Sequence, residues 1–148
     1  MTIRPAFSVR NAHWGMDGPA LRAVREAVFV REQGVPVELE WDEYDATSLH
    51  VLAEADGDPI GTGRLLPDHQ IGRMAVLPGW RGCGVGSAIL AALVELAMAR
   101  GSRVVCLNAQ TRAQGFYLRH GFIAEGKEFP DAGIPHIRMR RELHVPNH

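Results

Sequence analysis

The sequence predicts an α/β (α+β) fold in which helices cover a β-sheet, and three observations support this prediction. The chain has 148 residues and an apolar content of 46%, which suits one domain over residues 1–148 with a substantial buried core. Segments with the periodicity of strands alternate with segments that have the periodicity of helices. Hairpin signals and strand–helix–strand units both occur, and this mixture favours a sheet flanked by helices.

Helices are expected at residues 19–33, 87–100 and 112–119. The first is amphipathic, with Asp17 available as its N-cap and Gly34 as its end. The second is rich in alanine, free of proline and followed by Gly101. The third is short and is closed by Gly121. The acidic stretch after the first helix, residues 38–45, lacks clear periodicity, so we expect a loop or a frayed short helix there.

Strands are expected at residues 49–55, 59–66, 71–77, 104–107, 122–128 and 136–143. Between the first two, Asp56-Gly57 supplies the positive φ angles that a tight hairpin needs. The last two are linked by the turn-rich segment PDAGIP, residues 130–135. The second helix connects two of these strands and completes a strand–helix–strand unit.

Charge and cysteine content exclude several classes of partner. The 16 basic and 17 acidic residues nearly cancel, so small molecules are favoured as partners over nucleic acid or an anionic membrane. The first residues lack the apolar core of a secretory signal, and no apolar run is long enough to span a bilayer, so we expect a cytoplasmic protein. Cys83 and Cys106 form no CxxC pair, and we expect two free thiols and no metal site.

The segment RMAVLPGWRGCGVGSAIL, residues 73–90, joins an expected strand to an expected helix through a glycine-rich turn. Unpaired backbone N–H groups at the start of a helix favour a phosphate ligand. A P-loop pattern fails because the lysine and the hydroxyl residue that should follow Gly84 are absent. A dinucleotide fingerprint is weak because Ser87 or Ile89 occupies its third glycine position. A tight turn that binds no ligand is the remaining alternative.

The RxxGxG pattern of Arg81 to Gly86 resembles the coenzyme A pyrophosphate loop of the GNAT superfamily of acyl-CoA N-acyltransferases. A second segment, NAQTRAQGFYLRHGF from Asn108 to Phe122, resembles a later landmark of the family, a helix that carries a tyrosine and precedes Gly-Phe. The segments FVREQGVPVELEWDEYD and GIPHIRM are similar to the small ElaA- and YjcF-like branch. The resemblance covers nearly the whole chain. It implies a mixed, mostly antiparallel sheet of about six to seven strands, splayed at the cofactor cleft and flanked by about four helices.

By this resemblance, the chain transfers an acetyl group from acetyl-CoA to an amine of a small molecule or peptide in a ternary complex. The residues implied in acetyl-CoA binding are Met74, Ala75, Val76, Arg81, Gly82, Cys83, Gly84, Val85, Gly86, Ser87, Asn108 and Phe116. The backbone of Met74 and Val76 would pair with the pantetheine amides, and the Val76 N–H would stabilise the oxyanion. Arg73 and Arg112 are further candidates for phosphate contacts, and Tyr117 is the implied proton donor to departing coenzyme A. The resemblance also implies a homodimer.

The attacking amine needs a base because a lysine-like ammonium, with a pKa near about 10.4, is protonated at neutral pH. The candidates are Glu32, Glu40, Asp42 and His136, or a water chain, and the sequence does not rank them. The acidic residues of the segment 38–45 could also attract a cationic amine. Each acidic residue could instead be a solvated surface charge, and His136 a hydrogen-bonded strand histidine.

Three alternatives to this enzyme are open. A non-catalytic acyl-CoA-binding sensor or interaction module would keep the loop without a working acid and base, and the presence of Tyr117 argues against it. A thiol-nucleophile enzyme would use Cys83 at the start of the helix, but family analogues vary at that position. A nucleotide-binding protein is disfavoured by the glycine spacing. Small amines, aminoglycosides, polyamines, amino acids and protein N-termini all present the same attacking nitrogen, so the sequence leaves the acceptor open.

Overall fold

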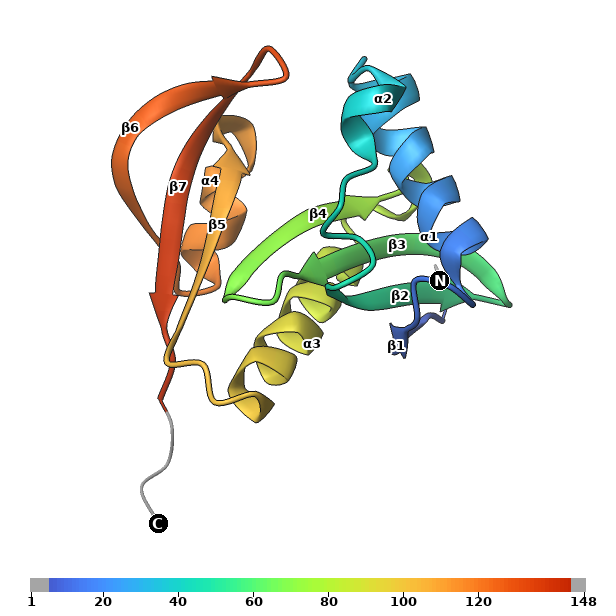
Figure 1. The fold of residues 1–148 in the computed structure, drawn as a ribbon, viewed down its shortest axis with the longest axis horizontal. Coiled ribbons are helices and arrows are strands. Elements are labelled where there is room, and N and C mark those ends of the chain that lie inside the picture. Colours follow the sequence, from blue (N-terminus) through green and yellow to red (C-terminus); the bar gives the residue numbers. More distant parts are fainter. Residues whose placement is uncertain (1–5, 145–148) are drawn as a thin grey trace, which may run out of the picture.

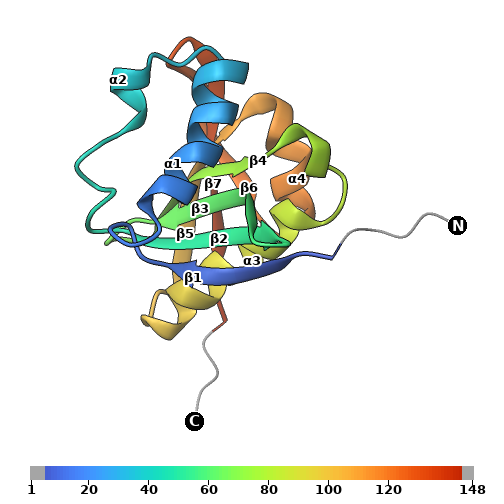
Figure 2. The ribbon, with the colours of Figure 1, turned by 90° about the vertical axis from the view of Figure 1, so that its right-hand side faces the viewer.

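The computed structural model describes residues 6–144 and confirms a mixed α/β fold with a mostly antiparallel sheet. Over these residues the sheet has seven strands in the order β1-β2-β3-β4-β5-β7-β6. The strands are β1 (Ser8–Ala12), β2 (Leu49–Ala55), β3 (Asp58–Leu65), β4 (Gln70–Val76), β5 (Val104–Gln110), β6 (Ile123–Asp131) and β7 (Ile134–Glu142). The α-helices are α1 (Gly18–Arg25), α2 (Val37–Glu40), α3 (Val85–Ala99) and α4 (Gln114–Arg119). Helix α1 covers one face of the sheet and α3 covers the other (Figure 1, Figure 2).

The sheet opens between β4 and β5, the one parallel pair among the described strands. These strands pair at two positions, Gln70 with Cys106 and Ile71 with Leu107, and diverge beyond them. Figure 1 shows the two halves that result, β5 to β7 with α4 on one side and β1 to β4 with α1 and α3 on the other. The predicted splay is therefore present, and backbone groups of both strands face the opening without a strand partner.

The core lies chiefly between α3 and the strands it covers, and two glycines of β3 set how closely the helix packs. A Cβ atom at Gly61 would lie 2.8 Å from Ile89 Cδ1, and one at Gly63 would lie 2.8 Å from Leu93 Cδ1. Packing this dense leaves no room for a larger side chain at either position. The two glycines therefore fix the position of α3 and of the glycine-rich turn from which it starts.

The first predicted helix is not one regular α-helix. Helix α1 ends at Arg25, and η1 (Glu26–Glu32) continues it as a π-helix, a form that frequently occurs at functional sites. Asp17 does not cap α1 with its side chain, because its carboxylate accepts the His13 N–H (2.8 Å) and pairs with Arg10 (2.8 Å).

Among residues 6–144, no helix combines the length and apolar character that crossing a membrane requires.

Two tight turns join neighbouring strands. Asp56-Gly57 connects β2 to β3 with φ angles of +51° and +80°, which confirms the predicted hairpin. Ala132-Gly133 connects β6 to β7 with φ angles of +51° and +76°. The predicted turn in the PDAGIP segment is therefore present, but it is shorter than the segment because both strands extend into it.

The region that follows α3 also differs from its predicted boundaries. Strand β5 continues to Gln110 because β7 pairs with it along its whole length, so Asn108 lies inside the strand and not at its end. The helix predicted at residues 112–119 begins with a 3₁₀ turn, η3 (Thr111–Ala113), before α4. The acidic stretch contains the short helix α2, one of its two predicted forms.

Candidate active site

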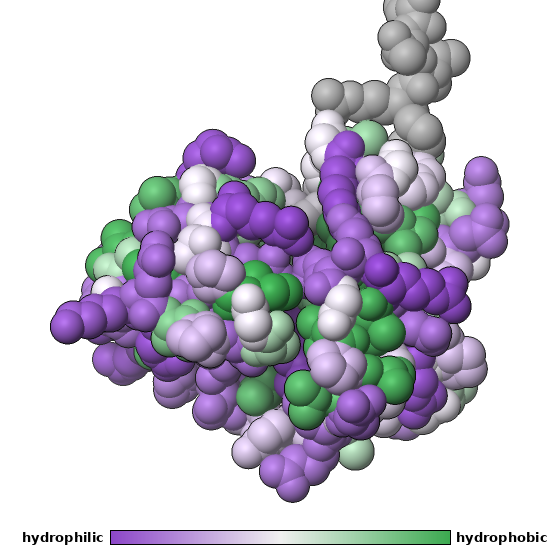
Figure 3. Space-filling model, turned by 90° about the horizontal axis from the view of Figure 1, so that it is seen from above, coloured by the Kyte–Doolittle hydropathy of each residue, from purple (hydrophilic) through white to green (hydrophobic). Residues whose placement is uncertain are grey.

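A cleft of about 710 Å³ fills the opening between β4 and β5. One wall is formed by η1 and α2, the floor by β4 and β5, and the other wall by α4 and the β6–β7 hairpin. Seen from above, this face has hydrophobic side chains in its middle and hydrophilic ones around them (Figure 3). A cleft of this volume accommodates a small-molecule ligand.

The register of β4 decides which backbone groups reach the cleft. Val76 lies opposite Gly61, and the Leu77 N–H donates to the Ile60 carbonyl (2.9 Å). In an antiparallel ladder, the residues next to a hydrogen-bonded pair form a non-hydrogen-bonded pair, whose N–H and C=O groups point away from the partner strand. Val76 and Gly61 are such a pair, because they lie next to Leu77 and Ile60. The Val76 N–H and C=O therefore point toward β5 and the cleft. The Val76 carbonyl accepts a hydrogen bond there from Arg81 Nε (3.0 Å).

A β-bulge interrupts β4 next to these groups. The register shifts so that Arg73 and Met74 together oppose one residue of β3. Arg73 has a φ of +49°, a left-handed conformation that is uncommon outside glycine. Its guanidinium lies against Glu40 and Asp42, with N–O distances of 3.0 and 3.3 Å. These contacts stabilise the bulge, which changes the direction of β4 at the point where β4 diverges from β5.

The glycine-rich turn leads directly into α3. Gly82 and Gly84 have φ angles of +78° and +86°, which glycine adopts without the strain of a side chain. Gly84 is the N-cap, and no side chain caps the helix, so its first N–H groups lack a capping partner. Gly86 lines the cleft, whereas the Val85 side chain is buried in the core. An anion at this end of the cleft would meet these N–H groups and the positive end of the helix dipole.

Helix α4 contributes two aromatic side chains to the cleft, Phe116 and Tyr117. Phe116 lies over Gly86, where a Cβ atom would be 3.5 Å from the ring Cζ. The Tyr117 hydroxyl donates to Met74 Sδ at 3.7 Å, a weak acceptor. Burial raises the pKa of Tyr117 to about 12. The hydroxyl is therefore protonated at physiological pH, the state that a proton donor requires.

His136 reaches the cleft from β7. Its side chain is buried, and its ring stacks on that of Phe129 with a centroid distance of 6.0 Å. Nδ1 lies 2.7 Å from the Ile134 carbonyl, which makes Nδ1 the donor nitrogen. In the neutral ring Nε2 is then the acceptor, as a base requires.

Glu32 and Arg81 bind each other. Their side chains form a bidentate pair, with N–O distances of 2.7 and 2.6 Å. The hydrogen bond from Arg81 lowers the pKa of Glu32, which makes this carboxylate a weaker base. Glu32 lines a smaller recess of about 490 Å³ beside the main cleft. This placement argues against the predicted role of Glu32 as a base and leaves Arg81 neutralised in the absence of a ligand.

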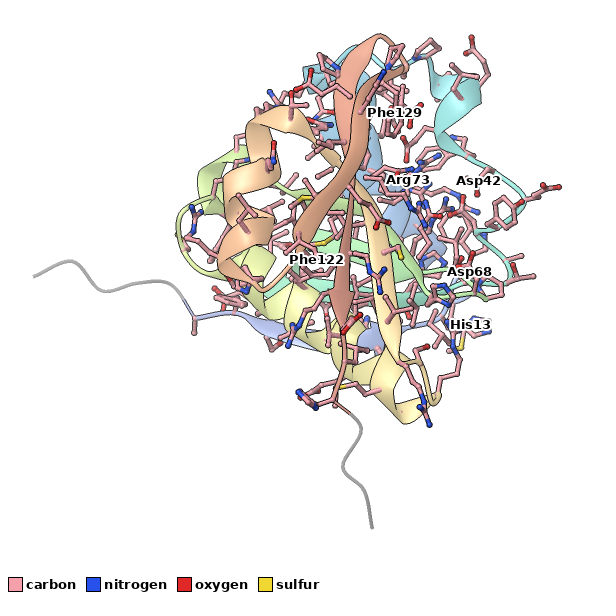
Figure 4. The ribbon with its side chains drawn as sticks, turned by 90° about the vertical axis from the view of Figure 1, so that its left-hand side faces the viewer. His13, Asp42, Asp68, Arg73, Phe122 and Phe129 are labelled. Atoms are coloured by element: carbon pink, nitrogen blue, oxygen red, sulfur yellow. The ribbon has the colours of Figure 1, made fainter. Side chains whose placement is uncertain are left out.

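Three of the five carboxylates of the acidic stretch are engaged by arginines, whereas Glu38 and Glu43 are exposed and form no ion pair among residues 6–144. Ion pairs of 2.6 to 3.3 Å join Glu40, Asp42 and Asp45 to Arg25, Arg64 and Arg73. Three negative charges thus meet three positive ones, and the candidates Glu40 and Asp42 are both engaged. Figure 4 shows Arg73 beside Asp42. Arg73 lines the cleft, but its ion pairs with these carboxylates argue against its predicted role as a phosphate contact.

The cleft brings together most of the predicted site residues. Those that line it are Glu40, Arg73, Met74, Ala75, Val76, Arg81, Gly86, Asn108, Arg112, Phe116, Tyr117 and His136. The remaining predicted cofactor residues lie in the glycine turn and the first turn of α3, namely Gly82, Cys83, Gly84, Val85 and Ser87. The Ser87 hydroxyl lies 2.9 Å from His120 Nε2. Cys83 and Cys106 are free thiols, as expected.

Sequence reasoning missed the contacts that link η1 to the far side of the cleft. Gln110 Nε2 donates to Gln33 Oε1 (2.8 Å), which joins the end of η1 to β5. Arg112 Nε donates to the same Gln110 side chain (3.0 Å). Phe29 of η1 lines the cleft as well. Gln33 and Gln110 are 77 residues apart, so no local pattern in the sequence could have indicated their contact.

The chain is similar in sequence and in structure to N-acetyltransferases and acyl-CoA N-acyltransferases. The family model of the acetyltransferase (GNAT) domain matches residues 19–143. YjcF of Bacillus subtilis, an uncharacterized N-acetyltransferase, is 43% identical over 123 residues, which cover 80% of this chain and 88% of YjcF. The structure of Escherichia coli ElaA matches with a TM-score of 0.83 and 29% identity, covering 93% of this chain and 100% of ElaA. The structure of an acyl-CoA N-acyltransferase of Pseudomonas aeruginosa matches with a TM-score of 0.82 and 30% identity, covering 92% of this chain and 99% of that protein.

Proposed function

The chain belongs to the GNAT acetyltransferase family, as its sequence predicts, and on this premise we propose that it transfers an acetyl group from acetyl-CoA directly to an amine. One observation carries the proposal: an uncapped helix start, β4 backbone groups without a strand partner and the Tyr117 hydroxyl meet in one cleft. The acceptor is an amine of a small molecule or peptide. The cytoplasmic location and the homodimer stay predictions.

Acetyl-CoA would lie extended between β4 and β5. Its diphosphate would accept hydrogen bonds from the N–H groups that follow Gly84, where the helix dipole favours an anion. The Val76 N–H and C=O would pair with the pantetheine amides as an added strand does. For this, Arg81 must release the Val76 carbonyl. Its guanidinium could then contact a phosphate instead.

The reaction uses three groups of the protein around the thioester. The amine nitrogen attacks the carbonyl carbon, so that a C–N bond forms and the C–S bond breaks. The Val76 N–H stabilises the negative charge that develops on the carbonyl oxygen. Before the attack, the ammonium loses one proton to His136 Nε2, directly or through water, and His136 releases this proton to solvent. When the C–S bond breaks, the nitrogen loses its second proton to solvent, and Tyr117 donates its hydroxyl proton to the departing sulfur. Tyr117 then recovers a proton from solvent, which restores the starting state with one proton released overall.

Thermal unfolding with and without acetyl-CoA tests the binding step. At about a hundred times its dissociation constant a ligand adds about 2.7 kcal/mol, which raises the unfolding midpoint by roughly 5 to 10 °C for a chain of this size. A Gly86→Val variant should lose this rise, because the branched side chain would occupy the space beside Phe116.

Ala91→Val is the matched control, since Ala91 is an exposed position of the same helix. It should keep the full rise with acetyl-CoA. A rise that survives in Gly86→Val, or no rise in the wild type, would contradict the assigned site. Binding without release of thiol across a broad panel of amines would instead favour the non-catalytic sensor.

Two variants separate the predicted bases. Glu32→Gln should leave kcat unchanged and tighten acetyl-CoA binding about 1.5- to 5-fold, because it frees Arg81 from an exposed ion pair. His136→Gln should lower kcat about tenfold at neutral pH, with the loss shrinking at higher pH as the amine deprotonates unaided. Steady-state kinetics across pH measure both effects. A loss of kcat in Glu32→Gln together with normal turnover in His136→Gln would reverse the assignment.

A further inference from the structure

We propose that the acceptor is a primary amine with one positive charge on an apolar body, and not a polyamine or an aminoglycoside. This inference rests on the proposed function and concerns the acceptor end of the same cleft. Three features of the cleft support it: the pairing of its charges, the character of its walls and the position of one carboxylate.

The charges of the acceptor wall are already paired within the protein. Arg73 contacts both Glu40 and Asp42, and Arg64 contacts both Asp42 and Asp45. The carboxylates of Glu40 and Asp45 are also nearly fully buried. A polycation would have to displace a guanidinium to reach any of them. The carboxylates at this wall of the cleft are therefore already engaged by arginines, and the unpaired Glu38 of α2 does not line the cleft, so a second or third ammonium gains no free carboxylate here.

Apolar side chains line both sides of the acceptor end, beside polar ones such as Gln33 and Gln110. Phe29 of η1 and Leu39 of α2 line the cleft on one side, with Val35 between them in the chain, and Ile134 lines it on the other. Leu39 is 58% exposed although it is a large apolar residue. Figure 3 shows hydrophobic surface in the middle of this face. Burying an apolar body against these side chains is favourable, whereas burying an unpaired ammonium there is costly.

One carboxylate remains for the amine itself. Among the described residues, two carboxylates line the cleft, Glu40 and Asp131, and Asp131 has no ion-pair partner in residues 6–144. Asp131 stands at the tip of the β6–β7 hairpin, and His136 lies farther along the same hairpin. The cleft can therefore hold one ammonium near Asp131 and pass its proton to His136.

Hexylamine and hexamethylenediamine test this inference, because they have the same chain length and differ by one ammonium. The wild type should acetylate hexylamine with a kcat/KM about tenfold higher than that of the diamine, although the diamine has two reactive ends. Leu39→Glu should reverse this preference by placing a carboxylate on the apolar wall. Val37→Glu is the matched control, because Val37 is a 46% exposed residue of α2 that does not line the cleft.

Equal or better turnover of the diamine by the wild type would overturn the inference and leave the proposed function intact. A reversal produced equally by Val37→Glu would overturn it too, because a general change in surface charge would then explain the preference.

If neither amine is acetylated by protein that binds acetyl-CoA, the proposed function fails. Calorimetric titration of both amines into the coenzyme A complex then decides the inference separately: tighter binding of hexylamine supports it, and equal or tighter binding of the diamine overturns it.

Discussion

Replacement of Tyr117 by phenylalanine is expected to lower kcat by about 10²- to 10⁴-fold and to leave the affinity for acetyl-CoA nearly unchanged. The ring packs edge-on against Phe116 and Phe122, at centroid distances of 5.1 and 5.9 Å, and phenylalanine keeps both contacts. The hydroxyl that is lost donates only to Met74 Sδ, so the fold loses little. Steady-state kinetics and calorimetric titration of acetyl-CoA measure the two quantities separately.

The chain offers a matched control because it has two tyrosines. Tyr44 is 46% exposed and does not line the cleft, so Tyr44→Phe should keep normal turnover. The pH profile is a second readout. With the pKa of Tyr117 raised to about 12, the donor stays protonated, and wild-type kcat should not fall between about pH 7 and pH 10. Normal turnover in Tyr117→Phe would remove this residue from the mechanism.

The secondary structure could be predicted largely because its signals are local. Strand alternation, the Asp56-Gly57 turn and the apolar face of α3 each depend on neighbouring residues. The π-helix η1 could not be predicted, since it differs from an α-helix by one residue in its hydrogen bonding and periodicity does not encode that shift. The glycine turn and Tyr117 could also be located from the sequence, because each belongs to a motif whose residues are contiguous in the chain.

The charges of the site could not be placed from the sequence, because their partners are distant in the chain. Glu32 is 49 residues from Arg81, and Arg73 is 33 residues from Glu40. A list of acidic residues suggested an attractive surface, whereas the fold brings an arginine to each of the buried ones. Net charge along a segment therefore did not indicate the charge that a substrate would meet.

Replacement of Arg25 by methionine is expected to lower the free energy of unfolding by about 3 to 5 kcal/mol, because it leaves two buried carboxylates with one partner fewer. Arg25 is 1% exposed and donates to Glu40 (2.8 Å) and Asp45 (2.6 Å). The unfolding midpoint should fall by roughly 10 to 20 °C. Arg10→Met is the matched control: Arg10 also binds two carboxylates, but it is 45% exposed, so the loss should stay under about 1 kcal/mol.

The pH dependence of this loss identifies its cause. Burial alone would raise the pKa of Asp45, but the hydrogen bond and charge of Arg25, with the charge of Arg64, hold that pKa below its usual value. A carboxylate with a lowered pKa stabilises the fold above its unfolded pKa of about 3.9, and this contribution is lost as pH falls through the folded value. In Arg25→Met the effect of burial on Asp45 is no longer offset by Arg25, so the pKa of Asp45 rises. Protonation of Asp45 at low pH then removes the destabilisation that its unpaired charge causes in the variant. The difference in unfolding midpoint between wild type and variant should therefore be largest near neutral pH and shrink toward about pH 4. A difference that stays constant would mean that Arg25 contributes through its packing on Trp41, 5.0 Å from the ring centroid, and not through its charge.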